Sequence, residues 1–362
     1  MPDKLIYPCI SSTACGCPNP FQLETYHGCT FNCLYCFSKD SHYYKTGFTE
    51  LKKNNPKKFA KVLDFWTKSK NKKLSPSEKI FFKHRVPLLI GTKSDPFPTI
   101  EGKDHVTEDF LRVLGKYDYP ARILSKNAKM AYYVLNRLPR KQNIAVNISI
   151  SSLDTDFISK LEPAFTPFER LKYIEYIQDI GYPVFVNLRP VIFDRFMEEL
   201  PGIMRTLREI NVWGFTFYPL QINMLSSKKL KKRFDEKFPG LYDNYLELCR
   251  PAGFYFSLKE EYQFLLNEKV KKLAKEYDLN YISSLDCFYG KNQECCGTER
   301  LRNYNTFDYN LRAYYSEQFK ESELCSCKIK GFSDIKGRGY NFNKNQTLKE
   351  YTDDRMQRYF KE

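Results

Sequence analysis

Short apolar runs alternate with amphipathic stretches through the middle of this chain. Each run is rich in β-branched or aromatic residues and is bounded by Gly, Pro or polar residues, a pattern that predicts a strand. The stretches between the runs repeat apolar residues with a helical period. The predicted strands are 21–26, 87–91, 121–124, 144–150, 183–188, 212–218 and 279–283, and the predicted helices are 107–114, 131–138, 167–179, 198–210 and 260–277.

This alternation predicts an α/β fold whose parallel strands are joined by right-handed crossovers. A barrel or partial barrel would place its chemistry at the carboxyl ends of the strands. Strands that are continuously apolar suit an open doubly wound sheet equally well. The pattern alone therefore leaves two architectures open.

Three cysteines stand in one loop directly after the first predicted strand: Cys29, Cys33 and Cys36. A C-x3-C-x2-C loop lets three thiolates reach three corners of a [4Fe–4S] cluster, and no further cysteine follows until Cys249. One iron is then left open to bind a small molecule. Structural zinc sites usually close their shell with four ligands from paired knuckles, and ferredoxin clusters are fully ligated by protein, so the spacing favours neither.

This loop, with Tyr35 before its last cysteine, resembles the radical-SAM superfamily. Two further segments, 91–101 and 161–171, resemble the spore photoproduct lyase-like (DNA repair photolyase-like) branch, the second through its Glu-Pro and Arg-Leu pairs. The resemblance spans roughly residues 19–220 and implies a partial (β/α)6-type TIM barrel of the radical SAM type. It also implies that a reduced cluster cleaves S-adenosylmethionine (SAM) to a 5′-deoxyadenosyl radical, which abstracts hydrogen from a substrate.

The resemblance further implies which side chains hold SAM. Lys126 matches a family lysine near the methionine carboxylate, and Ser149 or Ser151 matches a nearby serine. Asn187 and Arg189, at the end of the fifth predicted strand, are expected to reach SAM or substrate. Strand ends are loops by construction, so each residue could equally be a solvated side chain or a helix cap. The predicted cofactor-binding set is Tyr35, Lys126, Ser149, Ser151, Asn187 and Arg189.

One position departs from the family. The cysteine that donates hydrogen in spore photoproduct lyase aligns with Thr92, and threonine cannot readily donate that atom. Repair of a thymine dimer by that route is therefore not expected. The four histidines form no constellation, and the catalytic residues stay unassigned.

The formal net charge is +15, from 58 basic and 43 acidic side chains. Basic residues concentrate in 52–85, where aromatic residues are interleaved, in 228–233 and in 336–340. Such an excess favours nucleic acid as a partner, although a lysine-rich composition would also decorate any surface this way. A base buried in a duplex would have to be flipped out, or presented on a single strand, to meet a radical.

A second group of cysteines follows the barrel pattern: Cys287, Cys295, Cys296, Cys325 and Cys327. Four thiolates suffice for an auxiliary iron–sulfur cluster, which we favour, or for a structural zinc site. Cys9, Cys15 and Cys17 could join that site, whereas Cys249 is predicted to pack on a helix. The expected division is a Cys-containing segment 1–18, a radical-SAM barrel 19–285 and a small Cys-rich extension 286–362.

We therefore expect a radical-SAM enzyme that modifies or repairs a nucleic-acid base or nucleotide, with a reducing partner such as flavodoxin or ferredoxin. The first alternative is a radical-SAM enzyme that modifies a peptide or protein with the help of an auxiliary cluster. The second is a non-catalytic, metal-stapled nucleic-acid-binding module. No export signal and no apolar run of roughly 20 residues is visible, so a cytoplasmic location without a membrane partner is expected.

Overall fold

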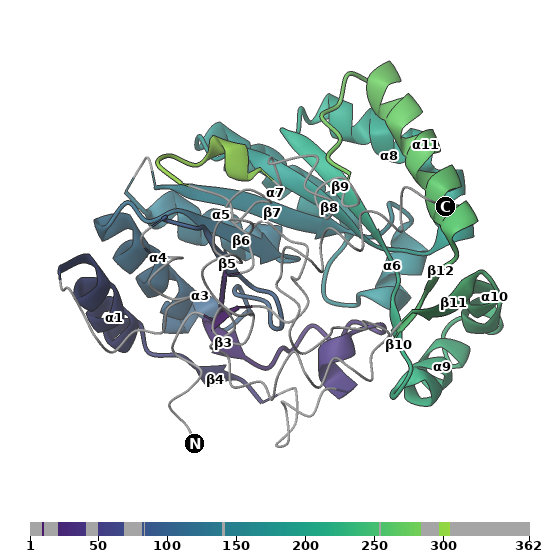
Figure 1. Cartoon of the computed structure of the whole chain (residues 1–362), viewed down its shortest axis with the longest axis horizontal. Helices are drawn as coiled ribbons and strands as arrows, with labels where there is room; N and C mark the ends of the chain where they lie inside the picture. Colours follow the sequence, from purple (N-terminus) through teal and green to yellow (C-terminus); the bar gives the residue numbers. More distant parts are fainter. Residues whose placement is uncertain are drawn as a thin grey trace, which may run out of the picture.

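The computed structural model describes residues 9–10, 21–40, 50–68, 82, 84–139, 142–252, 255–283 and 297–304. Its centre is a seven-stranded sheet in the order β1-β2-β5-β6-β7-β8-β9 (Figure 1). Six of these strands, β2, β5, β6, β7, β8 and β9, run parallel, and β1 pairs antiparallel with β2 at the edge. The strands are β1 (Cys9–Ile10), β2 (Phe21–Leu23), β5 (Leu88–Ile90), β6 (Ala121–Ser125), β7 (Ile144–Ile150), β8 (Val184–Val191) and β9 (Gly214–Pro219).

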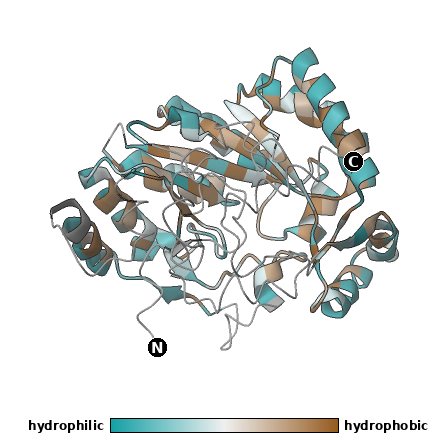
Figure 2. Cartoon of the chain, viewed as in Figure 1, coloured by the Kyte–Doolittle hydropathy of each residue, from teal (hydrophilic) through white to brown (hydrophobic). Residues whose placement is uncertain are grey.

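Helices connect successive parallel strands. They are α1 (Pro56–Lys68), α3 (Glu101–Asp104), α4 (Val106–Lys116), α5 (Ala128–Arg137), α6 (Thr155–Leu161), α7 (Pro167–Asp179) and α8 (Phe193–Glu209). One face of the sheet is apolar except for Ser125 at the end of β6, and its fully buried residues, such as Ile123, Val146 and Val186, share one core with Phe110 of α4 and Ile174 of α7. Figure 2 shows this brown interior between the strands and the inward sides of the helices.

The opposite face of the same strands carries a group of polar residues among apolar ones. Side chains alternate between the two faces of a strand, so Arg122, Asn147, Asn187 and Thr216 share one side of β6, β7, β8 and β9. All four are at least 95% buried. A doubly wound sheet would cover both faces with helices and would make both apolar. This polar inner face therefore decides in favour of the partial barrel.

A smaller antiparallel sheet follows β9. It has the order β10-β12-β11 and comprises β10 (Ile222–Asn223), β11 (Cys249–Ala252) and β12 (Tyr255–Leu258). The helices that accompany it are α9 (Ser227–Asp235), α10 (Leu241–Glu247) and α11 (Glu260–Glu276). A third, two-stranded sheet pairs β3 (Tyr26–His27) with β4 (Lys52–Lys53), and the short 3-10 helices are η2 (Phe37–Asp40) and η3 (Thr298–Arg300).

The predicted elements are largely confirmed, with several differences. The predicted strand 279–283 is not formed, and within it Tyr281 makes only an isolated bridge to Phe215. The first predicted strand divides, because its end turns away to pair with β4. Strand β8 continues to Val191, beyond its predicted end. The predicted helix at Cys249 is wrong: the residue opens β11 opposite Leu258. Pro251 disfavours helical backbone at the residue before it, so α10 ends at Glu247.

Residues 297–304 return to the amino-terminal edge of the sheet. The side chain of Asn143, before β7, accepts a hydrogen bond from the Arg302 amide (2.7 Å) and donates one to the Arg302 carbonyl (2.8 Å). Trp213, before β9, donates its indole N–H to Glu299. This part of the predicted extension therefore packs on the barrel, while the division at 285 stays a prediction. None of the helices within the described ranges has the length and hydropathy of a bilayer-spanning segment.

Candidate active site

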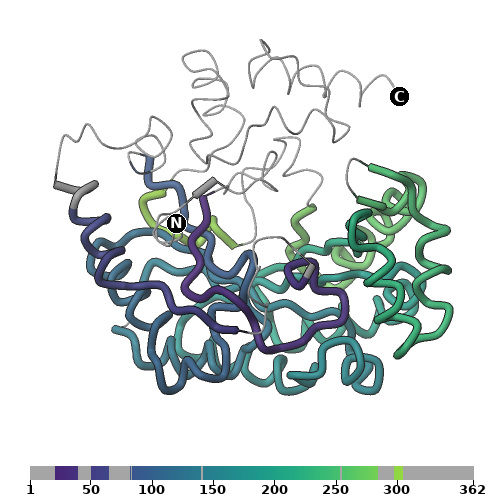
Figure 3. The backbone as a smooth tube through the Cα atoms, turned by 90° about the horizontal axis from the view of Figure 1, so that it is seen from below, coloured from purple at the N-terminus to yellow at the C-terminus, as the bar shows by residue number. Residues whose placement is uncertain are grey.

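The three-cysteine loop lies at the carboxyl edge of the sheet, after β3. Gly28 enters the loop with φ +88°, a backbone conformation that suits glycine. The backbone of Leu34, between the last two cysteines, is held at both ends. Its amide donates to the carbonyl of Leu161 (2.9 Å), and its carbonyl accepts from Nε of Arg233 (3.1 Å). The loop is thus fixed between the barrel and α9, and in Figure 3 it is part of the purple segment that crosses the middle of the molecule.

The thiols of this loop suit a cluster with three protein ligands. Burial raises the pKa of Cys29 to about 12, with Asp95 adding to the rise, and burial raises that of Cys33 to about 12, with Glu162 adding. The neighbouring Cys36 also raises the pKa of both thiols, because its sulfur interacts electrostatically with theirs. A bound metal would take the place of these protons.

A cubane cluster and a single zinc ion place different demands on the spacing of their ligands. Among the described residues, no three Cys, His, Asp or Glu side chains gather closely enough to hold a single metal ion. Ligands of a cubane bond different irons and so stand farther apart than the ligands of one zinc ion. Three thiols on one loop have the donor chemistry of a cubane with three protein ligands, and the binding of a cluster there stays a prediction.

A buried carboxylate brings several predicted residues together beside the loop. Glu162 is fully buried after α6, and its Oε1 accepts from Ser151 (2.5 Å) and from the Tyr35 hydroxyl. Nζ of Lys126 lies 3.8 Å from the same oxygen, and Arg170 forms an ion pair of 2.5 Å with Oε2. Burial alone would raise the pKa of Glu162, but Arg170 and Lys126 outweigh it, so the pKa is lowered and the carboxylate stays charged.

Two further carboxylates shape the segment after β5. Asp95 is partly buried and accepts from the Ser125 hydroxyl (2.6 Å) and the Lys126 amide (2.8 Å), which fixes the end of β6 where Lys126 stands. Burial raises the pKa of Asp95, and these hydrogen bonds oppose the rise. Glu24, at the end of β2, accepts from the amides of Thr92 (2.9 Å) and Lys93 (3.0 Å).

Sequence reasoning did not count Glu24, Asp95, Glu162 or Arg170 as site residues. The available signal was their position: each charged residue directly follows an apolar strand or stands in a segment that resembles the family. Their partners lie far away in the sequence, so the sequence alone could not show that they converge. They form the framework on which Lys126 and Tyr35 stand.

The other predicted residues lie on the inner face of the sheet. Asn187 is in the middle of β8, not at its end, and donates from Nδ2 to Oδ1 of Asn147 (3.3 Å). Ser149 pairs with Asn187 in register and is buried. Arg189 is partly exposed, and its guanidinium lies over the Tyr218 ring at 5.1 Å. Ser149 and Arg189 contact the Glu162 cluster through their backbone carbonyls, which accept from Arg170 (3.0 Å) and from the Ser151 hydroxyl (2.8 Å).

Several predicted residues fall outside the described part of the chain. These are the tail cysteines Cys287, Cys295, Cys296, Cys325 and Cys327, together with Cys15, Cys17 and the basic segment 336–340. Cys249 is described and buried in β11, where burial raises its pKa to about 11. The auxiliary metal site therefore stays a prediction.

The six parallel strands, the polar inner face and the three-cysteine loop at the carboxyl edge define a partial barrel of the radical-SAM type. Among solved structures, the chain resembles spore photoproduct lyase complexed with dinucleoside spore photoproduct, with a TM-score of 0.56, 15% identity and coverage of 78% of this chain and 79% of that one. A mutant of that lyase with bound AdoMet and dinucleoside spore photoproduct gives a TM-score of 0.56 at 14% identity, covering 78% and 80%. The fold implied by the cysteine loop is thus confirmed.

Comparisons by sequence add relatives whose names state no function. No protein-family model matches the chain. Uncharacterized proteins of Mycobacterium tuberculosis and Mycobacterium bovis are each 24% identical over 278 residues, which cover 74% of this chain and 77% of the relative. The functional argument therefore depends on the site.

Proposed function

We propose that this chain is a radical-SAM enzyme acting on a nucleic-acid base or nucleotide. The observation that carries the proposal is the convergence of the three-cysteine loop with Lys126, Tyr35 and Ser151 around Glu162. When bound, a reduced [4Fe–4S] cluster supplies the electron that cleaves SAM and yields the 5′-deoxyadenosyl radical.

The side chains of the site divide this work. Cys29, Cys33 and Cys36 would hold three irons and leave one open for SAM. The Lys126 side chain is 15% exposed, and its ammonium would bind the carboxylate of SAM. Glu162 holds Lys126 in position, because its Oε1 lies 3.8 Å from the Lys126 Nζ.

The substrate class is supported by the charge beside the cluster loop. His27, two residues before Cys29, pairs in register with Lys52 of β4, so β4 borders the loop. Lys52 and Lys53 are exposed, and the exposed Lys57, Lys58 and Lys61 continue this basic surface along α1. A row of lysines next to a radical site suits a phosphate backbone that presents one base. The solved structures of similar fold hold a dinucleoside photoproduct, which agrees with this class.

Thr92 separates this proposal from dimer repair by the family route. Its hydroxyl donates to Oε1 of Gln22 (2.8 Å) and contacts Glu24, at the position of the family's hydrogen-donating cysteine. A threonine hydroxyl cannot readily supply that hydrogen atom. We therefore expect a reaction whose substrate radical is quenched without a hydrogen-atom donor at residue 92, as in modification of a base.

The test is anaerobic reconstitution followed by SAM cleavage with dithionite. We expect a reduced cluster signal that changes when SAM is added, formation of 5′-deoxyadenosine, and loss of both in Cys29→Ala, Cys33→Ala and Cys36→Ala. Deuterated oligonucleotides should transfer deuterium into 5′-deoxyadenosine. Full SAM cleavage in any of the three variants would refute the cluster assignment, and transfer from a peptide but from no nucleic acid would replace the substrate class.

A further inference from the structure

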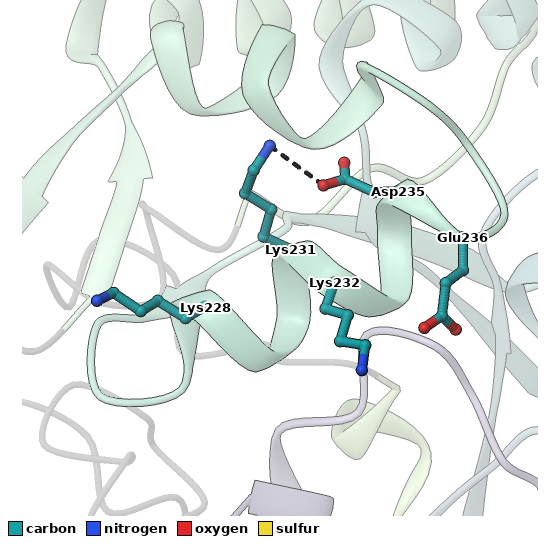
Figure 4. Close-up of a pocket in the computed structure, with 5 residues that line it drawn as sticks. All are labelled: Lys228, Lys231, Lys232, Asp235 and Glu236. Atoms are coloured by element: carbon teal, nitrogen blue, oxygen red, sulfur yellow. Dashed lines mark ion pairs between the residues drawn. The ribbon is translucent and has the colours of Figure 1, made fainter.

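Helix α9 carries a concentrated basic surface. Its sequence SKKLKKRFD buries Leu230 and Phe234 and so turns its lysines outward. Figure 4 shows Lys228, Lys231 and Lys232 with Asp235 and Glu236 along this stretch of chain. These five residues line an open hollow of about 490 Å³. Lys231 is neutralised by Asp235 (3.2 Å) and by Asp243.

The remaining lysines of the helix keep their charge available. Lys228, Lys229 and Lys232 are exposed, and within the described ranges none of them forms an ion pair. Just beyond the helix, Lys237 is also exposed.

This basic surface is connected to the cluster loop. Arg233, at the end of α9, donates to the Leu34 carbonyl at 3.1 Å. Next to that bond the loop itself reaches the surface, because Cys36 is partly exposed and the Phe37 side chain is 47% exposed. The helix therefore borders the place where the cysteine loop is accessible from outside.

The placement of α9 favours a partner that approaches the cysteine loop rather than the inner face of the sheet. Leu34 is bonded to the barrel through Leu161 and to α9 through Arg233, so the loop lies between the two. A substrate must reach the polar inner face, which lies on the barrel side. In Figure 1, α9 lies beside the small sheet of β10, β11 and β12, at the edge of the molecule.

We infer that α9 and the exposed turn at Cys36 and Phe37 form the docking surface for an acidic electron-donor protein, a one-electron flavin or iron–sulfur carrier. The inference rests on the proposed function, which needs one electron for each SAM molecule cleaved. The donor is oxidised by one electron, and SAM is reduced by that electron as its sulfonium carbon–sulfur bond breaks. Transient encounters of this kind use small interfaces whose charge complementarity governs the association rate.

The experiment reverses the charge of the surface and compares two reductants. The variant is K228E/K229E/K232E, and the matched control is K269E/K272E/K275E, which reverses three exposed lysines on α11. An acidic flavodoxin is the probe, and its binding to each protein is measured by fluorescence anisotropy over a salt series. We expect the α9 variant to bind about tenfold or more weakly, a loss typical of reversed charge pairs. The control should bind as the unaltered protein does.

Activity with the two reductants provides the second measurement. With reduced flavodoxin, 5′-deoxyadenosine should form more slowly in the α9 variant in proportion to the weaker binding, whereas with dithionite the rate should stay unchanged. Equal loss with both reductants would mean that α9 only supports the loop, and it would overturn the inference. Unchanged flavodoxin binding would overturn it as well, as would selective loss of DNA or RNA binding, which would make α9 a nucleic-acid contact.

The two proposals fail separately in this design. If the unaltered protein cleaves no SAM with either reductant, the proposed function fails. The salt-dependent binding of flavodoxin, and its loss in the α9 variant, would still decide the docking surface.

Discussion

Substituting Glu162 by glutamine should destabilise the protein strongly. The substitution keeps the shape of the side chain and removes the charge that faces Arg170 at 2.5 Å and Lys126 at 3.8 Å. The Arg170 side chain is only 2% exposed, so its guanidinium would remain buried without its carboxylate partner. Breaking a buried ion pair from one side costs about 3–5 kcal/mol, and we expect a loss in that range.

The assay is urea unfolding of the metal-free protein at neutral pH, with Glu169→Gln as the matched control. Glu169 pairs with Lys129 at 3.2 Å, but both side chains are at least 36% exposed, and exposed pairs are worth about 0–1 kcal/mol. Glu162→Gln should therefore lower the free energy of unfolding several times more than its control does.

A double-mutant cycle with Arg170→Met isolates the pair. If the two charges stabilise each other, the double variant should lose less stability than the sum of the single variants, because neither charge is then left alone. A loss below about 1 kcal/mol for Glu162→Gln, or strict additivity in the cycle, would refute the view that this ion pair holds the site together.

Three further outcomes are expected. Lys126→Met should weaken SAM binding to the reconstituted protein about 10- to 100-fold, since a charged hydrogen bond is worth about 1.5–3 kcal/mol; an unchanged Kd in calorimetry would contradict its role. Burial alone would raise the pKa of Glu108, but hydrogen bonds from Arg137, Arg112 and His105 lower it from 4.5 to about 2. Its stabilisation should therefore be complete above pH 4.5 and lost as the pH falls toward 2, and Glu108→Gln should flatten that part of the acid-unfolding curve. In the triple alanine variant of the cluster loop, about four irons per chain should remain, held by the tail cysteines; a metal-free protein would refute the auxiliary site.

Sequence alone determined the elements whose signals are local. Apolar runs with short periods predicted all six parallel strands, and β7 matches its predicted bounds at Ile144 and Ile150. The three-cysteine loop could also be recognised from the sequence, because its cysteines follow one another on a single stretch of chain. Lys126 and Ser151 were named through the resemblance to the family, and their role in binding SAM stays a prediction.

The tertiary structure decided what depends on distant partners. Where β8 ends could not be read from its residues, because its last pairing, Val191 with Pro219, belongs to β9. Cys249 became a strand residue through its pairing with Leu258. Neither partner is within reach of a local pattern.

The convergence of the site is the clearest case. Tyr35 and Glu162 stand 127 positions apart, and Arg233 reaches Leu34 over 199. Local periodicity reports which face of a strand or helix is buried, but a buried carboxylate is stable only when the fold delivers cations and donors to it. The sequence could therefore name the three-cysteine loop and the strand ends, while only the packed chain brought the loop and Lys126 together around Glu162 and placed α9 beside the loop.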